Sequence, residues 1–380
     1  MNLTSQQEAL RLTARDLAEK VLNPLAADID QQRRFPRENL EVISESGLMG
    51  LLVPQIYAGR GAGLTELAIV EMEFGRSCAS TAMCYLMHSC GCALIAARAT
   101  PEQGEAWLRP AAKGDYLATL AFSERGTGAH FYQPELRVER PNGSLSLSGR
   151  KSFVTSGGQA HLYPVLVNSS GKEGLDIFVL TADMPGIGFD GEWDGVGMAG
   201  NSSISATFTN VLLEEGDRLG REGEGQDLVF GVVAPTFLAG LAAVNVGIAQ
   251  GALDASVEHA KARKYPNGQA LAEIPIIQIN LAEMSIAVES ARQLVATAAS
   301  AADGGEAAAL PLLIQAKIAA TESARTVTEK AMQVGGGQAY SRRLPIERYW
   351  RDARAGAVMA PTNDVLREWL GKLLTGLPLF

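Results

Sequence analysis

The sequence has no excess of positive charge and few charged residues of any kind. Asp and Glu number 42 against 33 Lys and Arg among 380 residues, so the formal net charge is −9. A chain without net positive charge has no general attraction for polyanions. We therefore expect no nucleic-acid partner and no binding to anionic membranes. The length and the 47% of hydrophobic residues predict about two or three packed structural units.

Widely spaced cysteines and a leader peptide are missing as well. The four cysteines, Cys78, Cys84, Cys90 and Cys92, fall within one short stretch, whereas a secreted disulfide framework spreads its cysteines to close loops. The chain opens Met-Asn-Leu-Thr-Ser-Gln-Gln-Glu, without the basic start and apolar core of a signal peptide. Both features predict a reducing, cytoplasmic location.

One long run, from Leu228 to Leu253, contains no charged residue. Its length would suffice to span a bilayer. It also contains Pro235, Asn245 and several glycines, and a helix that is apolar all round is typical of a buried helix too. We interpret the run as the central helix of a soluble bundle, with a membrane span as the alternative.

The hydrophobic periodicity changes twice along the chain. Apolar residues recur at helical spacing from residue 3 to about 118, and again from Gly225 nearly to the C-terminus. The part between them holds alternating runs and a hairpin signal at Pro141-Asn142-Gly143. We predict an α+β fold, mostly α, with three domains. These are an N-terminal α-helical domain (1–118), a middle antiparallel β domain (119–226) and a C-terminal helical bundle domain (227–380).

Several short strings combine glycine, hydroxyl and aromatic residues. They are Phe122 to Gly128, Lys151 to Gly158, Gly197 to Ser202, Gly220 to Gly225, Gln333 to Gly337 and Pro345 to Ala353. Each alone is typical of a turn or a helix cap. A Rossmann protein is disfavoured, because no Gly-x-Gly-x-x-Gly follows a strand, and no P-loop is present. Taken in order and at these spacings, the strings resemble the acyl-CoA dehydrogenase family of flavoproteins over nearly the whole chain.

The resemblance implies a helical domain, a β domain and a C-terminal four-helix bundle, assembled as a homotetramer or homodimer that holds FAD between subunits. It implies that FAD is contacted by residues in five places. These are Phe122 and Ser123; Phe153, Val154 and Thr155; Arg263 at the pyrophosphate; Gln333, Val334, Gly335, Gly336 and Gly337 from a neighbouring subunit; and Thr362 and Asp364. The implied substrate is an acyl thioester, bound to CoA or to a carrier.

The family's catalytic base is a glutamate, which takes the α-proton while hydride leaves for the flavin. Aligned on Arg351 to Arg354, one family position for this glutamate is Ala360. The other position, on the first long helix of the bundle, is Phe237, followed by Leu238. Neither place holds a carboxylate. A serine that helps to hold the thioester arm in the family is Ala129 here, so the CoA contacts are altered.

His88 forms a stripe with Cys84 and Cys92 on one face of a predicted helix, in the region that lines the acyl pocket of the family. One straight helix cannot wrap three ligands around a tetrahedral ion, so we expect no metal site. A buried core stripe is one interpretation. The alternative is that His88 lines the pocket and polarises or deprotonates the substrate.

Three hypotheses follow from these departures. The first is a flavin-dependent oxygenase or monooxygenase, because a base-free, apolar flavin face would protect an adduct with O2. The second is α,β-dehydrogenation with an unusual base such as His88 or an already acidic α-proton, and an electron-transfer partner as acceptor. The third is a non-catalytic FAD-binding homologue. Cys84, Cys92, Ala129, Phe237, Leu238 and Ala360 are the candidate substrate-contacting residues.

Overall fold

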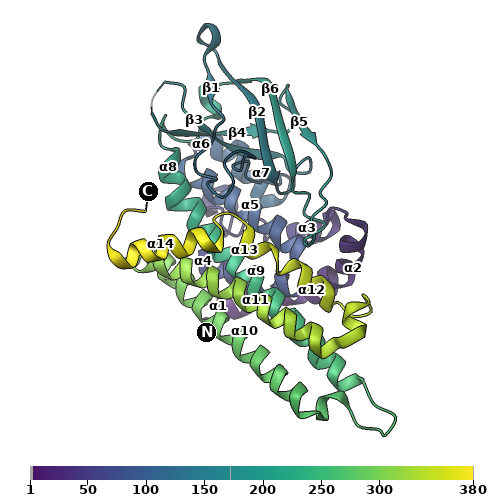
Figure 1. The fold of residues 1–380 in the computed structure, drawn as a ribbon. Helices are drawn as coiled ribbons and strands as arrows, with labels where there is room; N and C mark the ends of the chain where they lie inside the picture. The colour runs from purple at the N-terminus through teal and green to yellow at the C-terminus, as the bar shows by residue number, and fades with distance from the viewer. Residues whose placement is uncertain (1–2, 172, 380) are drawn as a thin grey trace.

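The computed structural model describes residues 3–171 and 173–379. An N-terminal group of helices is followed by strands and then by a second group of helices (Figure 1). The first group comprises α1 (Ser5–Leu17), α2 (Asn23–Gln32), α3 (Arg37–Glu45), α4 (Leu64–Ser77), α5 (Ala79–Arg98), α6 (Pro101–Gln103) and α7 (Arg109–Lys113). Thr4 begins α1 with a capping box, and Pro101 stands at the first position of α6, where a missing N–H costs nothing.

The β domain contains a four-stranded antiparallel sheet and a separate antiparallel pair. The sheet has the order β1-β2-β6-β5, and the pair is β3-β4. The strands are β1 (Val138–Glu139), β2 (Leu145–Val154), β3 (Leu162–Asn168), β4 (Leu175–Thr181), β5 (Ile187–Asp190) and β6 (Ile204–Leu213). The predicted hairpin is confirmed, since Val138 pairs with Leu147 across the turn at 141–143. β3 and β4 are buried almost throughout, in keeping with their continuous apolar sequences.

The C-terminal helices form a bundle around α9. They are α8 (Gly225–Leu228), α9 (Ala234–Ala262), α10 (Pro275–Asp303), α11 (Ala309–Tyr340), α12 (Ile346–Asp352), α13 (Ala355–Val358) and α14 (Asn363–Thr375). α9 packs against α4, α5, α10 and α11. It comes very close to α4, because a Cβ on Gly75 would stand 2.5 Å from the Val244 carbonyl oxygen. Only glycine permits this approach.

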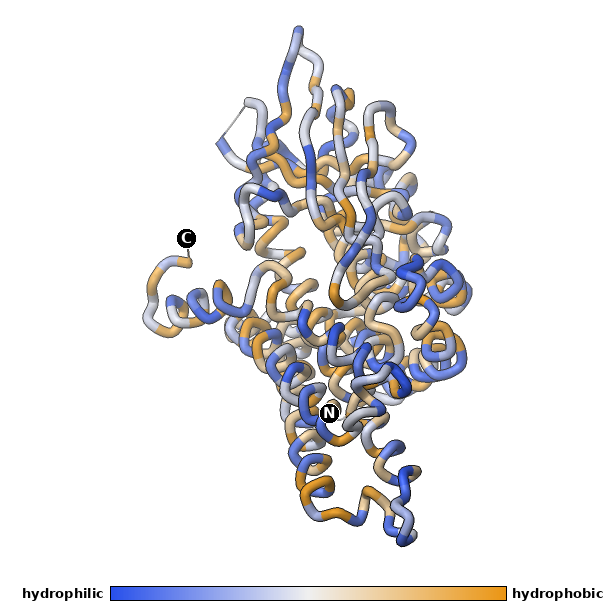
Figure 2. Tube along the Cα trace, turned by 45° about the vertical axis from the view of Figure 1, so that its right-hand side comes forward, coloured by the Kyte–Doolittle hydropathy of each residue, from blue (hydrophilic) through white to orange (hydrophobic). Residues whose placement is uncertain are grey.

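The long uncharged run lies inside the bundle. In Figure 2 the hydrophobic segments run through the middle of the molecule, and hydrophilic ones lie at outer turns and loop tips. Two described helical stretches, Ala79–Arg98 and Gly225–Ala262, are long and apolar enough to cross a membrane, yet 89% and 72% of their apolar windows are buried. Such burial is typical of core helices. The sequence analysis singled out only the second of them.

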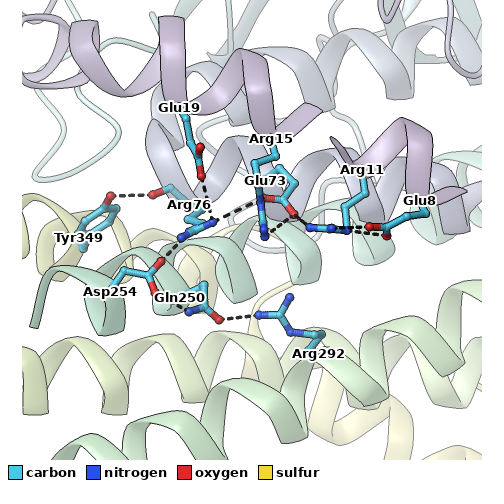
Figure 3. A network of polar contacts seen from close by, with 10 residues as sticks. All are labelled: Glu8, Arg11, Arg15, Glu19, Glu73, Arg76, Gln250, Asp254, Arg292 and Tyr349. Atoms are coloured by element: carbon cyan, nitrogen blue, oxygen red, sulfur yellow. Dashed lines mark hydrogen bonds and ion pairs between the residues drawn. The ribbon is translucent and has the colours of Figure 1, made fainter. Parts of the chain in front are cut away.

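A network of ion pairs fastens α1 to the bundle on the side where α1, α4, α9 and α10 meet (Figure 3). Its centre is Glu73 of α4, whose side chain is only 5% exposed and which accepts from Arg11 and Arg15 of α1. Arg76 continues the network to Asp254 on α9, at 2.6 Å. Exposed ion pairs at a protein surface contribute little, because their side chains move freely. Glu73 is nearly buried, so Arg11 and Arg15 are held in one geometry around it.

Candidate active site

The two β-domain loops predicted to contact FAD are joined to each other. The Ser152 amide donates to the Ser123 carbonyl oxygen at 2.8 Å. The Lys151 ammonium donates to the Phe122 carbonyl oxygen at 3.1 Å and to the Glu124 carboxylate at 2.6 Å. Both charged side chains are buried. The structure therefore brings the two predicted contact segments together through one interior ion pair.

This ion pair is also bonded to the backbone beyond it. The Glu124 carboxylate also accepts from the amides of Glu135 and Leu136. Burial lowers the pKa of Lys151 to about 8, and the Glu124 charge opposes that change. These additional hydrogen bonds fix the buried ion pair and keep the loops in a single arrangement.

Phe153 presents an open aromatic face beside this pair of loops. Its backbone is left-handed, with φ at 55°, and 67% of the residue is exposed. Its ring meets Trp193 edge to face, at 6.5 Å between centroids. A bulky residue in this backbone region costs free energy and occurs mostly at functional sites. An exposed ring held in this way suits stacking on, or edging against, a flat heterocycle.

Thr155 is fixed by its hydroxyl and its carbonyl. The Thr155 hydroxyl lies 3.0 Å from that of Ser203, and its carbonyl oxygen accepts from the Thr119 hydroxyl at 2.6 Å. Nearby, both side-chain polar atoms of Asn201 are buried with no hydrogen-bond partner among the described residues. Unpaired buried polar atoms are costly unless a ligand or water meets them. The surroundings of Thr155 therefore fit a polar group such as a flavin ring edge.

Arg263 and the segment Gln333 to Gly337 lie elsewhere. The segment from Arg263 to α10 and the C-terminal end of α11 are at the end of the bundle remote from the β domain (Figure 1). Arg263 is exposed and stands over the Tyr265 ring. Gly336 leaves helical geometry, with φ 54° and ψ −139°, and Cβ atoms on Gly336 and Gly337 would meet nothing within 4 Å. One chain does not bring these residues to Phe122 and Phe153.

The turn between α13 and α14 contains Ala360 and runs across the bundle on the side that faces the β domain (Figure 1). Thr362 caps α14, because its hydroxyl accepts from the Val365 amide. Asp364 is exposed and pairs with Arg367 at 2.8 Å. From beneath, the Lys317 ammonium on α11 donates to the Pro361 carbonyl oxygen. Sequence reasoning did not identify Lys317, because nothing local in the helix pattern marks this contact.

The start of α9 is apolar, as its sequence indicates. Leu238 is fully buried, and Phe237 and Ala360 are half-buried. Further along α9, a Cβ on Gly240 would stand 2.2 Å from the Leu86 side chain of α5. Leu86 therefore occupies space between α5 and α9 that only glycine leaves open. This contact was also missed from sequence, since it depends on how two distant helices pack.

The prediction that His88 acts as a base is wrong. The ring is fully buried, its Nδ1 accepts from the Ala118 amide at 3.1 Å, and its Nε2 therefore donates to the Met49 carbonyl oxygen at 2.9 Å. Burial lowers the pKa of His88 to about 4. Both ring nitrogens are thus engaged by main-chain groups. His88 is a core residue that joins α5 to two other segments.

Cys84 and Cys92 share this interior setting. Cys84 is buried near the Asn201 carbonyl oxygen, and Cys92 is buried against the His88 ring. Burial raises the pKa of both thiols to about 12. Ala129 lies half-buried in the turn after Glu124. Within the described residues, no group of three His, Cys, Asp or Glu side chains could hold a metal ion.

Comparison with known proteins covers all three parts of the chain. The models of the N-terminal, middle and C-terminal domains of acyl-CoA dehydrogenases match residues 4–115, 119–211 and 239–375. The bovine mitochondrial short-chain specific acyl-CoA dehydrogenase (Bos taurus) is 32% identical over 97% of this chain and 89% of its own length. The cyclohex-1-ene-1-carbonyl-CoA dehydrogenase of Geobacter metallireducens is 31% identical over 98% of this chain and 99% of its own.

The fold is shared with solved structures as well. Butyryl-CoA dehydrogenase from Megasphaera elsdenii superimposes with a TM-score of 0.93 at 28% identity, and 99% of each chain is covered. This agreement confirms the predicted arrangement of a helical domain, a β domain and a helical bundle. The chain belongs to the acyl-CoA dehydrogenase family.

Proposed function

We propose that this protein is an FAD-dependent dehydrogenase that introduces a double bond into a short acyl thioester. The observation that carries the proposal is the interior pairing of Lys151 with Glu124, which joins the segments Phe122 to Ser123 and Phe153 to Thr155, in a chain similar over its whole length to acyl-CoA dehydrogenases. The absence of a glutamate at Phe237 and Ala360 favours oxygenation as a sequence-based expectation. The relatives support its alternative, dehydrogenation, instead.

FAD is the cofactor of the family, and the residues present fit it. Phe153 and the hydroxyl and main-chain groups around Thr155 would hold the ring system, and Arg263 and the glycines at 335–337 would hold the distal part. When bound, FAD accepts the hydride that leaves the β-carbon. The chain's own part is to orient the thioester, exclude water and keep the ring in place.

The substrate chain should be short, because Leu86 occupies the space next to Gly240 between α5 and α9. The α-proton has no glutamate beside it at Phe237 or Ala360, and His88 is engaged by the backbone. The geometry is in keeping with a substrate whose α-proton is already acidic, so that a weak base in the site removes it. We propose that the acyl group is bound as a thioester either to CoA or to the thiol of a carrier protein.

A second copy of the chain would complete the site. The predicted FAD residues of one chain do not lie together, and α10 exposes Ile276, Ile279 and Ile286. Exposed isoleucines along one helix suit burial in a subunit interface. We therefore propose a homodimer or homotetramer in the cytoplasm, with an electron-transfer flavoprotein rather than O2 as the acceptor.

The test is an anaerobic titration of the FAD-loaded protein with short-chain thioesters that differ in the acidity of the α-proton. We expect loss of the flavin absorbance band with the more acidic members, formation of the 2,3-unsaturated thioester, and recovery of the band with a dye or an electron-transfer flavoprotein. A product that appears only with O2 and contains a new oxygen would establish the oxygenase hypothesis instead. No bleaching by any thioester, with or without O2, would favour a non-catalytic homologue.

A further inference from the structure

Lys317 is a fully buried lysine in the N-terminal third of α11. Its ammonium donates to the Pro361 carbonyl oxygen at 3.1 Å and to Asn363 Oδ1 at 2.8 Å. Both acceptors are neutral, and Lys317 makes no ion pair with any carboxylate of the described residues. They flank Thr362 on the turn that also contains Ala360. A buried ammonium therefore donates both of these hydrogen bonds to one short turn.

The groups around this turn form a closed polar network. The Thr321 hydroxyl accepts from the Asn363 side-chain amide at 2.9 Å, and Glu322 accepts from the same amide group at 3.0 Å. From α13, Gly356 packs so closely on Thr321 and on Asn245 of α9 that a Cβ there would clash with both. The turn is therefore held by side chains from α11 as well as by its own cap.

Electrostatics make this arrangement unfavourable for a cation. The N-terminus of α14, which begins at Asn363, presents the positive end of its helix dipole to Lys317. Burial and the nearby Arg367 lower the pKa of Lys317 to about 7, while Glu322 opposes them. The charged groups facing it are Glu322 on α11 and Arg367 with its partner Asp364 on α14. Strongly perturbed ionisable groups cluster at functional sites.

We propose that Lys317 is the positioning residue of the active site, and that its ammonium fixes the turn Ala360 to Thr362 in the place where this turn meets the flavin and the thioester. The inference rests on the proposed function, because that function places the turn at the reacting atoms. Lys317 itself touches neither. It acts through the Pro361 carbonyl and the Asn363 side chain. When Lys317 loses its proton, its amine becomes neutral and its hydrogen bonds to Pro361 and Asn363 weaken. The turn is then held less firmly.

The first test compares Lys317→Met with Lys330→Met in the FAD-loaded protein. Lys330 lies on the same helix and pairs with Glu283, away from the turn. Misplacement by about 1 Å can cost about a hundredfold in rate, so we expect kcat for thioester-dependent bleaching to fall about tenfold to a hundredfold in Lys317→Met, with KM little changed. The wild-type rate should fall as pH rises through about 7, and the variant should lack this limb. The same pH profile in the wild-type protein and in Lys317→Met would overturn the inference.

The second test uses the wild-type protein alone, so it requires neither a substrate nor a correctly folded variant. Hydrogen exchange of the wild-type protein is followed at pH 6 and pH 8 in peptides covering residues 357–366, corrected for intrinsic rates, with the peptide around Lys330 as the reference. We expect protection of the turn to drop at the higher pH while the reference is unchanged. The same protection at both pH values would refute the positioning role. A pH-dependent turn without thioester turnover would leave Lys317 in place and refute the proposed function alone.

Discussion

Individual side chains of the site were predictable where a motif fixes them and unpredictable where distant backbone does. The glycine- and hydroxyl-rich strings around Phe122, Ser123 and Thr155 predict loops, and the family resemblance implies their contact with FAD; the structure joins the two segments. For His88 the sequence leaves a core role and a pocket role open, because helical spacing says only that residues share a face. Whether that face meets a pocket or the Met49 and Ala118 backbone depends on segments far away in sequence.

Glu71 offers a test at this scale. Its carboxyl group is fully buried, neither oxygen has a partner among the described residues, and burial raises its pKa well above the usual value. The folded state therefore keeps a proton that the unfolded state loses above about pH 4.3. The free energy of unfolding should fall as pH rises from there toward the folded-state pKa. Glu71→Gln should flatten this dependence in urea unfolding curves from pH 5 to 8, and a slope equal to that of the wild type would contradict the assignment.

Lys151 should matter to both stability and cofactor. Lys151→Met leaves the Glu124 carboxylate buried without its cation, and breaking one side of a buried pair costs about 3–5 kcal/mol. We expect that loss in unfolding experiments, together with a lower FAD content. The double variant Lys151→Met with Glu124→Gln serves as the control and should regain part of the stability. A single variant as stable as the wild type would show that the pair does not hold the loops.

Among the elements, long helices and alternating strands were predictable, and short or irregular ones were not. The turn at 141–143 carries a clear signal, and β3, β4 and β6 lie in the part of the chain with alternating and continuous apolar runs. β5 carries no clear pattern, because Ile187 to Asp190 is short, half-exposed and follows a Pro-Gly turn. Its pairing with β6 is decided by the sheet rather than by its own sequence.

The attachment of α1 can be tested through Glu73. Glu73→Gln removes the carboxylate that accepts from Arg11 and Arg15, so we expect α1 to detach more often and proteases to cut near residues 18–23 sooner than in the wild type. Glu19→Gln is the matched control, since Glu19 is exposed and its contact with Arg76 is long, at 3.7 Å. An exposed pair of this kind contributes about 0–1 kcal/mol. Equal cleavage rates in both variants would show that the ion-pair network in Figure 3 does not hold α1 in place.

At the scale of the whole molecule, domain order was predictable from the two changes of periodicity, but the division of the FAD site was known only through the family. Periodicity does not say which end of a helix faces which domain. The structure places Arg263 and the Gly335 to Gly337 segment away from Phe153, so the site must be completed by another chain if these residues hold one FAD.

Mixed assemblies test this division. Arg263→Ala and Thr155→Val should each lower the FAD content of the assembled protein, while thermal unfolding of the cofactor-free protein changes little for exposed Arg263. Refolding the two variants together should restore some complete sites, because one interface can then combine the intact halves. FAD content and residual activity are the measurements. Mixed samples no better than the average of the two variants would show that each chain holds its own cofactor.

The separation of Phe153 from Arg263 also has a consequence for handling the protein. If the flavin bridges two chains, its release and the dissociation of the subunits are linked equilibria, and mass action applies to both. Flavin retention would then depend on the concentration of the protein itself. A dilute solution would lose its yellow colour, and concentrating it with added FAD would restore both the colour and the assembly.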